Sequence, residues 1–330
     1  MRAAVCHSYG PPDVVKVEEV PAPDLGAGQV RVRVAAAAVN FPDVLLVADR
    51  YQMSVPPPFV PGSEFAGVVD AVGAEVHAVT AGDRVFGTAM VGAFAEQIAV
   101  GAEAVIRIPD GVDAGAAAAF GVAHRTAYHV LRSVGRLQSG EQLVVLGAGG
   151  GVGLAAVQLG SILGASVTAV ASSAEKLDAA KQQGATTLIN HRSGDLRQAL
   201  RDALPDGADV VVDPVGGELA EPTLRSLRWG GRFVTVGYAS GTIPRIPLNL
   251  VLLKGVQIVG FQMLTFATNA PDEFRRNEAE LLDLLAARRA LPYIGKRFAL
   301  DDVVAALQFV ADGQAIGKVV LDVDAEIGRT

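Results

Sequence analysis

The 330 residues of the chain are enough for about two domains, and half of them are hydrophobic while 19% are charged. This composition excludes a disordered tail, and the net charge of −7 argues against a nucleic-acid-binding face, which would have to be basic. The single cysteine, Cys6, can form neither an intrachain disulfide nor a multi-cysteine zinc site, so we expect a reducing compartment. The N-terminal residues lack the apolar core of a signal peptide, which makes the cytoplasm the expected location.

Short apolar or alternating runs in the first hundred residues, separated by Pro, Gly and Asp, predict an antiparallel β domain. Its strands are expected at 14–20, 29–39, 65–72, 83–90 and 94–100. The segment Val55–Gly62 carries four prolines and is predicted to be an ordered loop rather than regular structure. Residues 114–135 have the pattern of two helical pieces.

From Leu143 onward, predicted strands and helices alternate, which indicates a parallel sheet covered on both faces. The strands are expected at 143–147, 166–171, 186–191, 209–216 and 232–238, and the helices at 151–164, 173–183, 194–203 and 218–228. The remaining elements are a strand at 255–263, a charged helix at 272–289, a strand at 293–298, a helix at 301–312 and a strand at 318–323.

An uncharged stretch from Gln142 to Ala174 is long enough to span a membrane. Seven glycines interrupt it, however, and the runs between them suit a strand, a helix and a second strand. We interpret the stretch as a βαβ unit, so no membrane partner is expected.

The segment LGAGGGVG, residues 146–153, follows a predicted strand and opens a helix, and Ala148, Gly150 and Gly153 fit an AxGxxG fingerprint. Small residues let the backbone approach a pyrophosphate, and the helix N-terminus offers free N–H groups to it. The predicted dinucleotide-binding residues of this turn are Gly149, Gly150, Gly151, Val152 and Gly153. The alternative is a tight packing turn that binds no ligand.

The end of the second strand of such a unit distinguishes NAD from NADP, since NAD sites carry an acidic residue there. Here Ser172 lies 19 residues after Gly153, followed by Ser173, and Lys176 comes one helical turn later. Hydroxyls and a lysine suit a 2′-phosphate, so the sequence predicts NADPH as the cofactor. Ser172 is also placed to cap the next helix in an S-x-x-E box, and Lys176 could be a solvated helix residue.

Over its whole length the chain resembles the zinc-free, zeta-crystallin-like quinone oxidoreductases of the medium-chain dehydrogenase/reductase superfamily. The matching segments include AVNFPDV (38–44), PGSEFAGVVDAVG (61–73), GAGGGVGLAAVQL (147–159), VVDPVGG (211–217) and GKVVL (317–321). The resemblance implies an α/β fold with two domains. A Rossmann domain with a doubly wound parallel sheet would span 123–265, and a discontinuous, β-rich GroES-like catalytic domain would span 1–122 and 266–330. It also implies NADPH-dependent reduction of quinones or activated alkenes by hydride transfer.

Zinc-dependent relatives carry G-H-E where this chain has Gly62-Ser63-Glu64, and a cysteine where the AVNFPD segment has none. The resemblance therefore implies that no metal is bound. Without a metal, another group must polarise the substrate or supply a proton.

The family pattern N-F-x-D followed by a tyrosine matches Asn40, Asp43 and Tyr51. The resemblance implies that Tyr51 lies beside the nicotinamide and donates a proton or a hydrogen bond, while Asn40 and Asp43 shape the site. The alternative for Tyr51 is an ordered tyrosine under the proline-rich loop. A second tyrosine found in many relatives is replaced here by Leu45.

Thr126 matches a family threonine near the nicotinamide, or else caps its helix. His124 and Arg125, just before it, would make the substrate pocket basic if they faced it; the alternative is a solvated pair. His191 matches a contact to the adenosine half of the cofactor, and Arg192 either reaches the 2′-phosphate or is simply exposed. Backbone contacts to the nicotinamide half are implied for Gly237, Tyr238, Phe261, Gln262 and Met263, whose alternative is ordinary sheet core.

Two other functions stay open. Reductase domains of polyketide synthases share the NFxDV segment and its tyrosine, which leaves an enoyl-thioester or alkenal reductase as an alternative. An NADPH-binding structural or sensor protein with little turnover is the other. The apolar strand 255–263 comes last in its domain, and its unpaired edge predicts a homodimer.

Overall fold

The computed structural model describes residues 1–324 and 327, and the chain divides into two compact units. Unit 1 comprises Met1–Val122 and the described residues from Ile294 onward, and unit 2 comprises Ala123–Tyr293. Residues 325, 326 and 328–330, which the sequence assigns to the catalytic domain, lie outside the described part.

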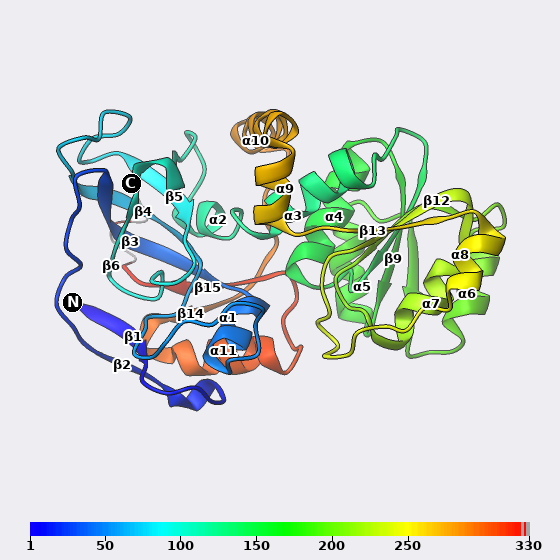
Figure 1. The fold of residues 1–330 in the computed structure, drawn as a ribbon, viewed down its shortest axis with the longest axis horizontal. Coiled ribbons are helices and arrows are strands. Elements are labelled where there is room, and N and C mark those ends of the chain that lie inside the picture. The colour runs from blue at the N-terminus through cyan, green and yellow to red at the C-terminus, as the bar shows by residue number, and fades with distance from the viewer. Residues whose placement is uncertain (325–326, 328–330) are drawn as a thin grey trace. The chain divides into compact units, whose positions relative to one another are not determined.

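Unit 2 contains a six-stranded sheet in the order β10-β9-β8-β11-β12-β13, and every neighbouring pair is parallel. This is the doubly wound Rossmann arrangement, with helices on both faces of the sheet (Figure 1). The strands are β8 (Gln142–Leu146), β9 (Ser166–Ala171), β10 (Thr187–Asn190), β11 (Ala208–Asp213), β12 (Leu227–Thr235) and β13 (Gln257–Gly260). The helices are α3 (Ala123–His129), α4 (Gly151–Ile162), α5 (Ala174–Gln182), α6 (Leu196–Ala203), α7 (Ala220–Leu224), α8 (Leu248–Lys254), α9 (Met263–Asn269) and α10 (Pro271–Ala286).

Unit 1 contains a seven-stranded sheet in the order β14-β15-β3-β4-β5-β7, with β6 also paired to β3, and a separate β1-β2 pair. All its pairs are antiparallel except β14 with β15. The strands are β1 (Arg2–Cys6), β2 (Val15–Glu19), β3 (Gln29–Val39), β4 (Glu64–Val72), β5 (Arg84–Thr88), β6 (Gln97–Gly101), β7 (Val105–Arg107), β14 (Ile294–Ala299) and β15 (Lys318–Asp322). The helices are α1 (Phe41–Val47), α2 (Ala114–Ala118) and α11 (Val303–Ala311). The predicted α/β fold, with a parallel Rossmann sheet and a separate β-rich unit, is confirmed.

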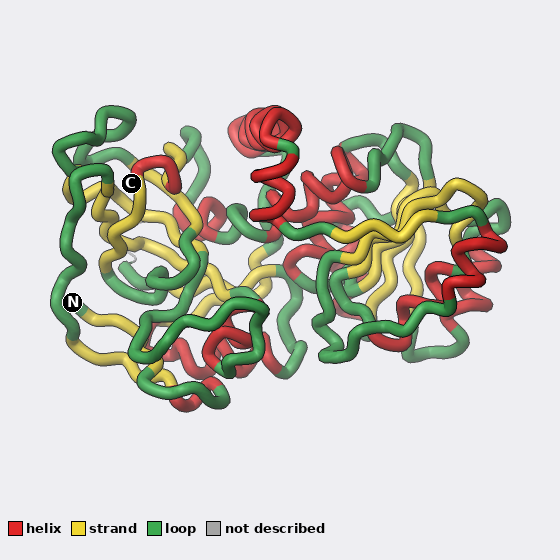
Figure 2. The backbone as a smooth tube through the Cα atoms, in the orientation of Figure 1, coloured by secondary structure: helices red, strands yellow, loops and turns green. Residues whose placement is uncertain are grey.

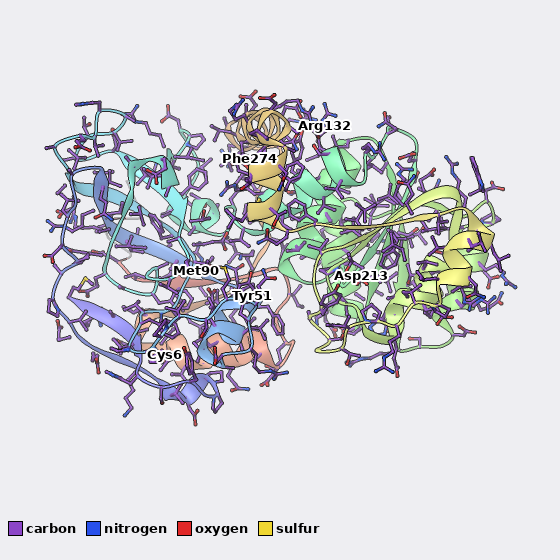
Figure 3. The ribbon with its side chains drawn as sticks, in the orientation of Figure 1. Cys6, Tyr51, Met90, Arg132, Asp213 and Phe274 are labelled. Carbon is purple, nitrogen blue, oxygen red and sulfur yellow. The ribbon has the colours of Figure 1, made fainter. Side chains whose placement is uncertain are left out.

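The division between the units differs from the predicted boundary at residue 265, because 266–293 pack with unit 2. Helix α10 is fixed to α3 by side-chain contacts: Glu278 bonds His129 Nε2 at 2.9 Å, and Glu280 accepts from the Tyr128 hydroxyl at 2.7 Å. The His129 ring also stacks on Phe274, with ring centres 4.8 Å apart and planes 8° apart. Phe274 is labelled in Figure 3.

Two elements of unit 2 correct the sequence prediction near its last strand. Helix α8 was not predicted, and it ends at Gly255, whose φ of 59° only glycine adopts easily. Strand β13 is shorter than the predicted 255–263, because the Gln262 side chain accepts from the Thr265 N–H at 2.6 Å and thereby caps α9.

The uncharged stretch that begins at Gln142 forms β8, α4 and β9, as the βαβ interpretation predicts (Figure 2). Within the described part of the chain, no helix has both the length and the apolar character needed to cross a membrane.

Candidate active site

Three glycines at the turn between β8 and α4, Gly147, Gly149 and Gly153, have no room for a side chain. A Cβ on Gly153 would lie 2.1 Å from the carbonyl oxygen of Gly147, which itself has a φ of 59°. Gly150 precedes the first turn of α4 and accepts from the Leu154 N–H at 2.8 Å. The N–H groups of Gly151, Val152 and Gly153 have no acceptor within the helix, so they are available to a phosphate. The turn therefore fits a dinucleotide pyrophosphate.

Two cationic side chains, Lys176 and Arg192, and the His191 imidazole gather beside this turn, beyond the ends of β9 and β10. Lys176 lies against Gly149, where a Cβ would approach the Lys176 Cβ to 2.5 Å. Burial lowers the pKa of Lys176, and the charge of Arg192 lowers it further. Burial also lowers the pKa of His191, and both Arg192 and Lys176 add to this effect. The charges of Lys176 and Arg192 therefore repel each other and disfavour protonation of His191, and an anion such as a 2′-phosphate would relieve the repulsion between the two cations.

The helix cap after β9 is displaced by one residue from the predicted S-x-x-E box. Ser173, not Ser172, is the N-cap of α5, and its hydroxyl accepts from the Lys176 N–H at 3.4 Å. Ser172 follows the last residue of β9 directly. Its hydroxyl is therefore not needed for capping, which leaves it for a ligand.

The remaining predicted cofactor residues follow the carboxyl ends of other strands, at the same edge of the sheet as the glycine turn. The His191 N–H donates to Ala171 O at 3.1 Å, beyond the end of β10. Gly237 follows β12 and precedes Tyr238, which is 41% exposed. The Phe261 N–H donates to Thr235 O at 3.1 Å, directly after β13. Ligands of doubly wound sheets bind at this edge.

Asp213, at the end of β11, was quoted within a family motif but given no role by the sequence (Figure 3). Its Oδ1 accepts from the N–H groups of Val215 and Gly216, both at 2.8 Å, and burial raises its pKa. The loop it closes packs on the glycine turn, since a Cβ on Gly147 would lie 2.6 Å from Val215 Cγ2. Asp213 thus shapes the edge where a cofactor would lie.

The structure excludes two alternatives for the residues around Thr126, namely a helix-capping Thr126 and a solvated pair of His124 and Arg125. Thr126 is the fourth residue of α3, so it does not cap that helix. His124 is 2% exposed, with Nε2 2.9 Å from Gln158 Oε1, and Arg125 Nε lies 2.8 Å from Glu278. Both residues are engaged inside unit 2 and are not a solvated pair; their engagement gives no support to a basic substrate pocket.

A buried polar cluster, which we call the Lys318 cluster, surrounds the start of α1 in unit 1. Lys318 Nζ donates to Glu64 Oε2 at 2.6 Å and to Asn40 Oδ1 at 2.5 Å. Asn40 Nδ2 donates to the same Glu64 oxygen at 2.8 Å, and the Asn40 N–H donates to Asp43 Oδ2 at 2.7 Å. The other oxygen of Glu64 accepts from the Val122 N–H. The structure thus brings Asn40 and Asp43 together, with two partners that sequence reasoning missed.

The Lys318 cluster contains Ser63 and Glu64 of the Gly62-Ser63-Glu64 segment that replaces the zinc-dependent G-H-E. Glu64 is fully buried and bonded on both oxygens, and an ammonium stands beside it. Among the residues that the structure describes, no group of three His, Cys, Asp or Glu side chains could hold a metal ion. These side chains do not fit a zinc ion.

Two carboxylates and one ammonium share the Lys318 cluster. Burial raises the pKa of Asp43 to about 7, although the Asn40 N–H, Ser63 and Lys318 oppose the shift and Glu64 adds to it. An unfolded Asp titrates near about 3.9, so the folded protein binds this proton more tightly between about pH 4 and pH 7. The stability contributed by this proton is therefore present in acid and is lost as the pH rises through about 7.

We expect Asp43→Asn, which is neutral and of similar size, to flatten the fall in stability between about pH 4 and pH 7. Urea unfolding of both proteins across this range measures the effect. The exposed Asp13→Asn serves as the control and should follow the wild type. Parallel curves for Asp43→Asn and wild type would contradict the assignment.

Tyr51 lies in the loop that follows α1, and its side chain is partly buried (Figure 3). Its hydroxyl accepts a long bond of 3.5 Å from Gln52 Nε2, and it donates to no acceptor in the described part of the chain. The loop is held elsewhere, by Tyr9 donating to Val55 O at 3.0 Å and by a backbone bridge from Phe59 to Cys6. The Tyr51 proton is thus uncommitted, and the predicted irregular loop Val55–Gly62 is confirmed.

Comparison with known proteins agrees with this division of the chain. The alcohol dehydrogenase GroES-like domain matches residues 26–110, and the domain described as zinc-binding dehydrogenase matches residues 151–286. The quinone oxidoreductase-like protein 2 homolog of Nematostella vectensis is 35% identical, covering 97% of this chain and 88% of that protein. Human quinone oxidoreductase is 30% identical, covering 97% of each. The chain belongs to the quinone oxidoreductase family of the medium-chain dehydrogenase/reductase superfamily.

Membership of this quinone oxidoreductase family makes the protein an oxidoreductase. A structure of Escherichia coli quinone oxidoreductase complexed with NADPH matches with a TM-score of 0.90 and 27% identity, covering 98% of this chain and 100% of that one. The resemblance noted in the sequence is confirmed. The domain described as zinc-binding dehydrogenase matches residues 151–286, and no side chain of the Lys318 cluster lies in that range.

Proposed function

We propose that this oxidoreductase uses NADPH to reduce quinones or activated alkenes and does so without a metal ion. The two cations Lys176 and Arg192, with His191 between their charges, lie beside the glycine turn, and this grouping is the observation that carries the proposal. The NADPH complex of the E. coli relative supports the same cofactor. When bound, NADPH supplies the hydride, and the protein binds, orients and protonates. We further propose a cytoplasmic location.

Different residues at the carboxyl edge of the unit 2 sheet bind different parts of NADPH. The first N–H groups of α4 hold the pyrophosphate, while Lys176, Arg192 and the Ser172 hydroxyl hold the 2′-phosphate. His191 lies against the adenosine half. Backbone groups of Gly237, Tyr238, Phe261, Gln262 and Met263, with Thr126, hold the nicotinamide half.

In unit 1 the Tyr51 phenol donates to the substrate oxygen as negative charge develops on it. The donor capacity of this hydroxyl is unused within the described residues, which supports the role. Asn40 and Asp43 act as positioning residues, because their bonds fix the start of α1, which leads into the Tyr51 loop.

NADPH oxidation measured across quinones, enals and enoyl-CoA thioesters, with and without EDTA, tests the proposal. We expect quinone turnover that EDTA leaves unchanged. Activity lost to EDTA and restored by zinc would contradict the metal-free assignment. Faster enoyl-thioester turnover would favour the reductase alternative, because the shared NFxDV segment and tyrosine occur there too. Tight NADPH binding without turnover would favour a sensor.

Lys176→Ala should weaken NADPH binding by about 10- to 100-fold, because one charge-assisted hydrogen bond contributes roughly 1.5–3 kcal/mol. NADH, which lacks the 2′-phosphate, should bind almost as before. Dissociation constants from calorimetry measure both, and Lys181→Ala, on an exposed face of the same helix, is the control. Equal losses for the two cofactors would show that Lys176 does not contact the 2′-phosphate.

We also propose a homodimer through β13, which is the last strand of its sheet and has no neighbour on one side among the described residues. Ile258 on this strand is 40% exposed, and Leu252 and Leu253 on the preceding α8 are 81% and 76% exposed. Ile258→Pro removes a backbone donor and should yield monomers in sedimentation experiments, whereas Ile258→Ala keeps the donor and should remain dimeric. A wild type that sediments as a monomer at every concentration contradicts the dimer.

A further inference from the structure

Unit 2 carries a hollow of about 440 Å³, away from the cofactor edge of the sheet. It is lined by α6 and the turn after it, the end of α8, and the segment that leads into β12. Strands β11 and β12 begin here, at Ala208 and Leu227. Since the strands are parallel, their starts and the glycine turn lie at opposite edges of the sheet. The hollow is therefore separate from the dinucleotide site.

Positive charge concentrates around this hollow in a chain whose net charge is −7. Its cationic lining residues are Arg197, Arg201, Arg225, Arg228 and Lys254, against one acidic lining residue, Asp206. Arg225 is paired with Glu221 at 2.6 Å, and Arg228 is paired with Asp209.

The other three cations of the hollow have no such ion pair. The side chains of Arg197, Arg201 and Lys254 have no hydrogen bond or ion pair with any residue that the structure describes. Lys254 is also partly buried, at the end of α8. Such a local excess of unpaired positive charge attracts an anion.

Trp229, the single tryptophan of the chain, stands at the rim of the same hollow and is 84% exposed. Its indole rests on Gly255, where a Cβ would lie 2.5 Å from Nε1. The Gly230 N–H donates to Gly255 O at 2.9 Å and fixes the backbone at this point. The turn therefore presents an aromatic face to solvent, beside the cations, where a flat ring could stack.

We propose that this hollow binds a mononucleotide, with its phosphate held by Arg197, Arg201 and Lys254 and its base stacked on Trp229. A volume of about 440 Å³ lies in the range of small-molecule sites. An inorganic anion would leave the indole unused, and a nucleic acid strand needs a basic face that extends beyond one hollow. Exposed apolar side chains such as Leu252 and Leu253 suit a second copy of the chain, whereas three cations without partners suit an anionic ligand.

Trp229 fluorescence reports this site alone, because the chain has no other tryptophan. AMP, adenosine and inorganic phosphate are titrated separately into protein holding one equivalent of NADP⁺, which fills the cofactor site. We expect saturable quenching by AMP, with adenosine and phosphate each at least about tenfold weaker, since each makes only part of the contacts. The Arg197→Ala, Arg201→Ala double variant should weaken AMP by about 100-fold and leave NADPH turnover unchanged.

Arg289→Ala, an exposed arginine of unit 2 outside the hollow, is the matched control and should bind AMP as the wild type does. Lys176→Ala should also leave the AMP response unchanged. The proposal for the cofactor site and the proposal for this hollow can therefore be contradicted independently, by NADPH binding to Lys176→Ala and by AMP binding to the double variant. No saturable quenching up to millimolar AMP, or quenching that survives the double variant, overturns the proposal. Tighter binding of an oligonucleotide than of AMP, or emission that shifts only with protein concentration, also overturns it, in favour of a nucleic acid or a second copy.

Discussion

Replacing Tyr51 with phenylalanine is expected to lower kcat by more than about a hundredfold and to leave NADPH affinity nearly unchanged. General acid catalysis contributes roughly 10²- to 10⁴-fold, whereas a positioning hydrogen bond contributes only a few-fold to about tenfold. The substitution removes one hydroxyl and keeps the ring that packs in the loop. It therefore separates proton donation from a structural role.

Steady-state kinetics with a quinone and an enal measure this effect, and Tyr293→Phe is the control for loss of a phenol elsewhere. The loss should be smaller for the quinone, because a quinol oxygen can take its proton from water while a carbon centre does so slowly. A change confined to KM would mean that the hydroxyl only holds the substrate. Wild-type rates on both substrates would return Tyr51 to the alternative of an ordered loop tyrosine.

Replacing Lys318 with methionine is expected to destabilise the protein by about 3–5 kcal/mol. The variant leaves the Glu64 carboxylate fully buried without its ammonium, and an uncompensated buried charge costs about this much. Methionine fills similar space, so lost packing contributes little. Urea unfolding at neutral pH measures the change.

A second substitution tests whether the lost stability comes from the unpaired charge of Glu64. Adding Glu64→Gln to Lys318→Met removes the unpaired charge, and the double variant should recover much of the lost stability. Lys318→Arg, which keeps the charge in a larger group, should lose less than Lys318→Met. A Lys318→Met protein within about 1 kcal/mol of the wild type would show that the buried pair does not stabilise the fold.

The sequence predicts most of the fold because its signals are local. Alternation along 29–39 and the apolar run in the predicted strand 209–216 mark strands within a few residues of their observed bounds. The assignment of α10 to unit 2 has a different origin. It depends on contacts such as Tyr128 with Glu280, which lie 152 residues apart, and no periodicity reports such a pair.

The residues of the candidate site also fall into those that local sequence signals identify and those that depend on distant contacts. The glycine turn could be read directly, since its function depends on the absence of side chains over a few consecutive positions. Lys318 could not, because its partner Glu64 lies 254 residues away. The one available signal was a lysine at the start of a strand that is otherwise apolar. The cap at Ser173 was displaced by one residue because adjacent serines carry the same local signal.

The pairing of β15 with β3 also fixes the order in which the chain can fold as it leaves the ribosome. Val319 pairs with Val39, so the sheet of unit 1 stays open until residue 319 has been made. Translation adds roughly 5–20 residues per second, and the stretch from 122 to 318 therefore takes roughly 10–40 seconds. Unit 2 is complete within that interval. Meanwhile the part of β3 from Ala36 to Val39 has no strand on the side opposite β4, and the Glu64 carboxylate lacks the ammonium of Lys318, which is made 254 residues later.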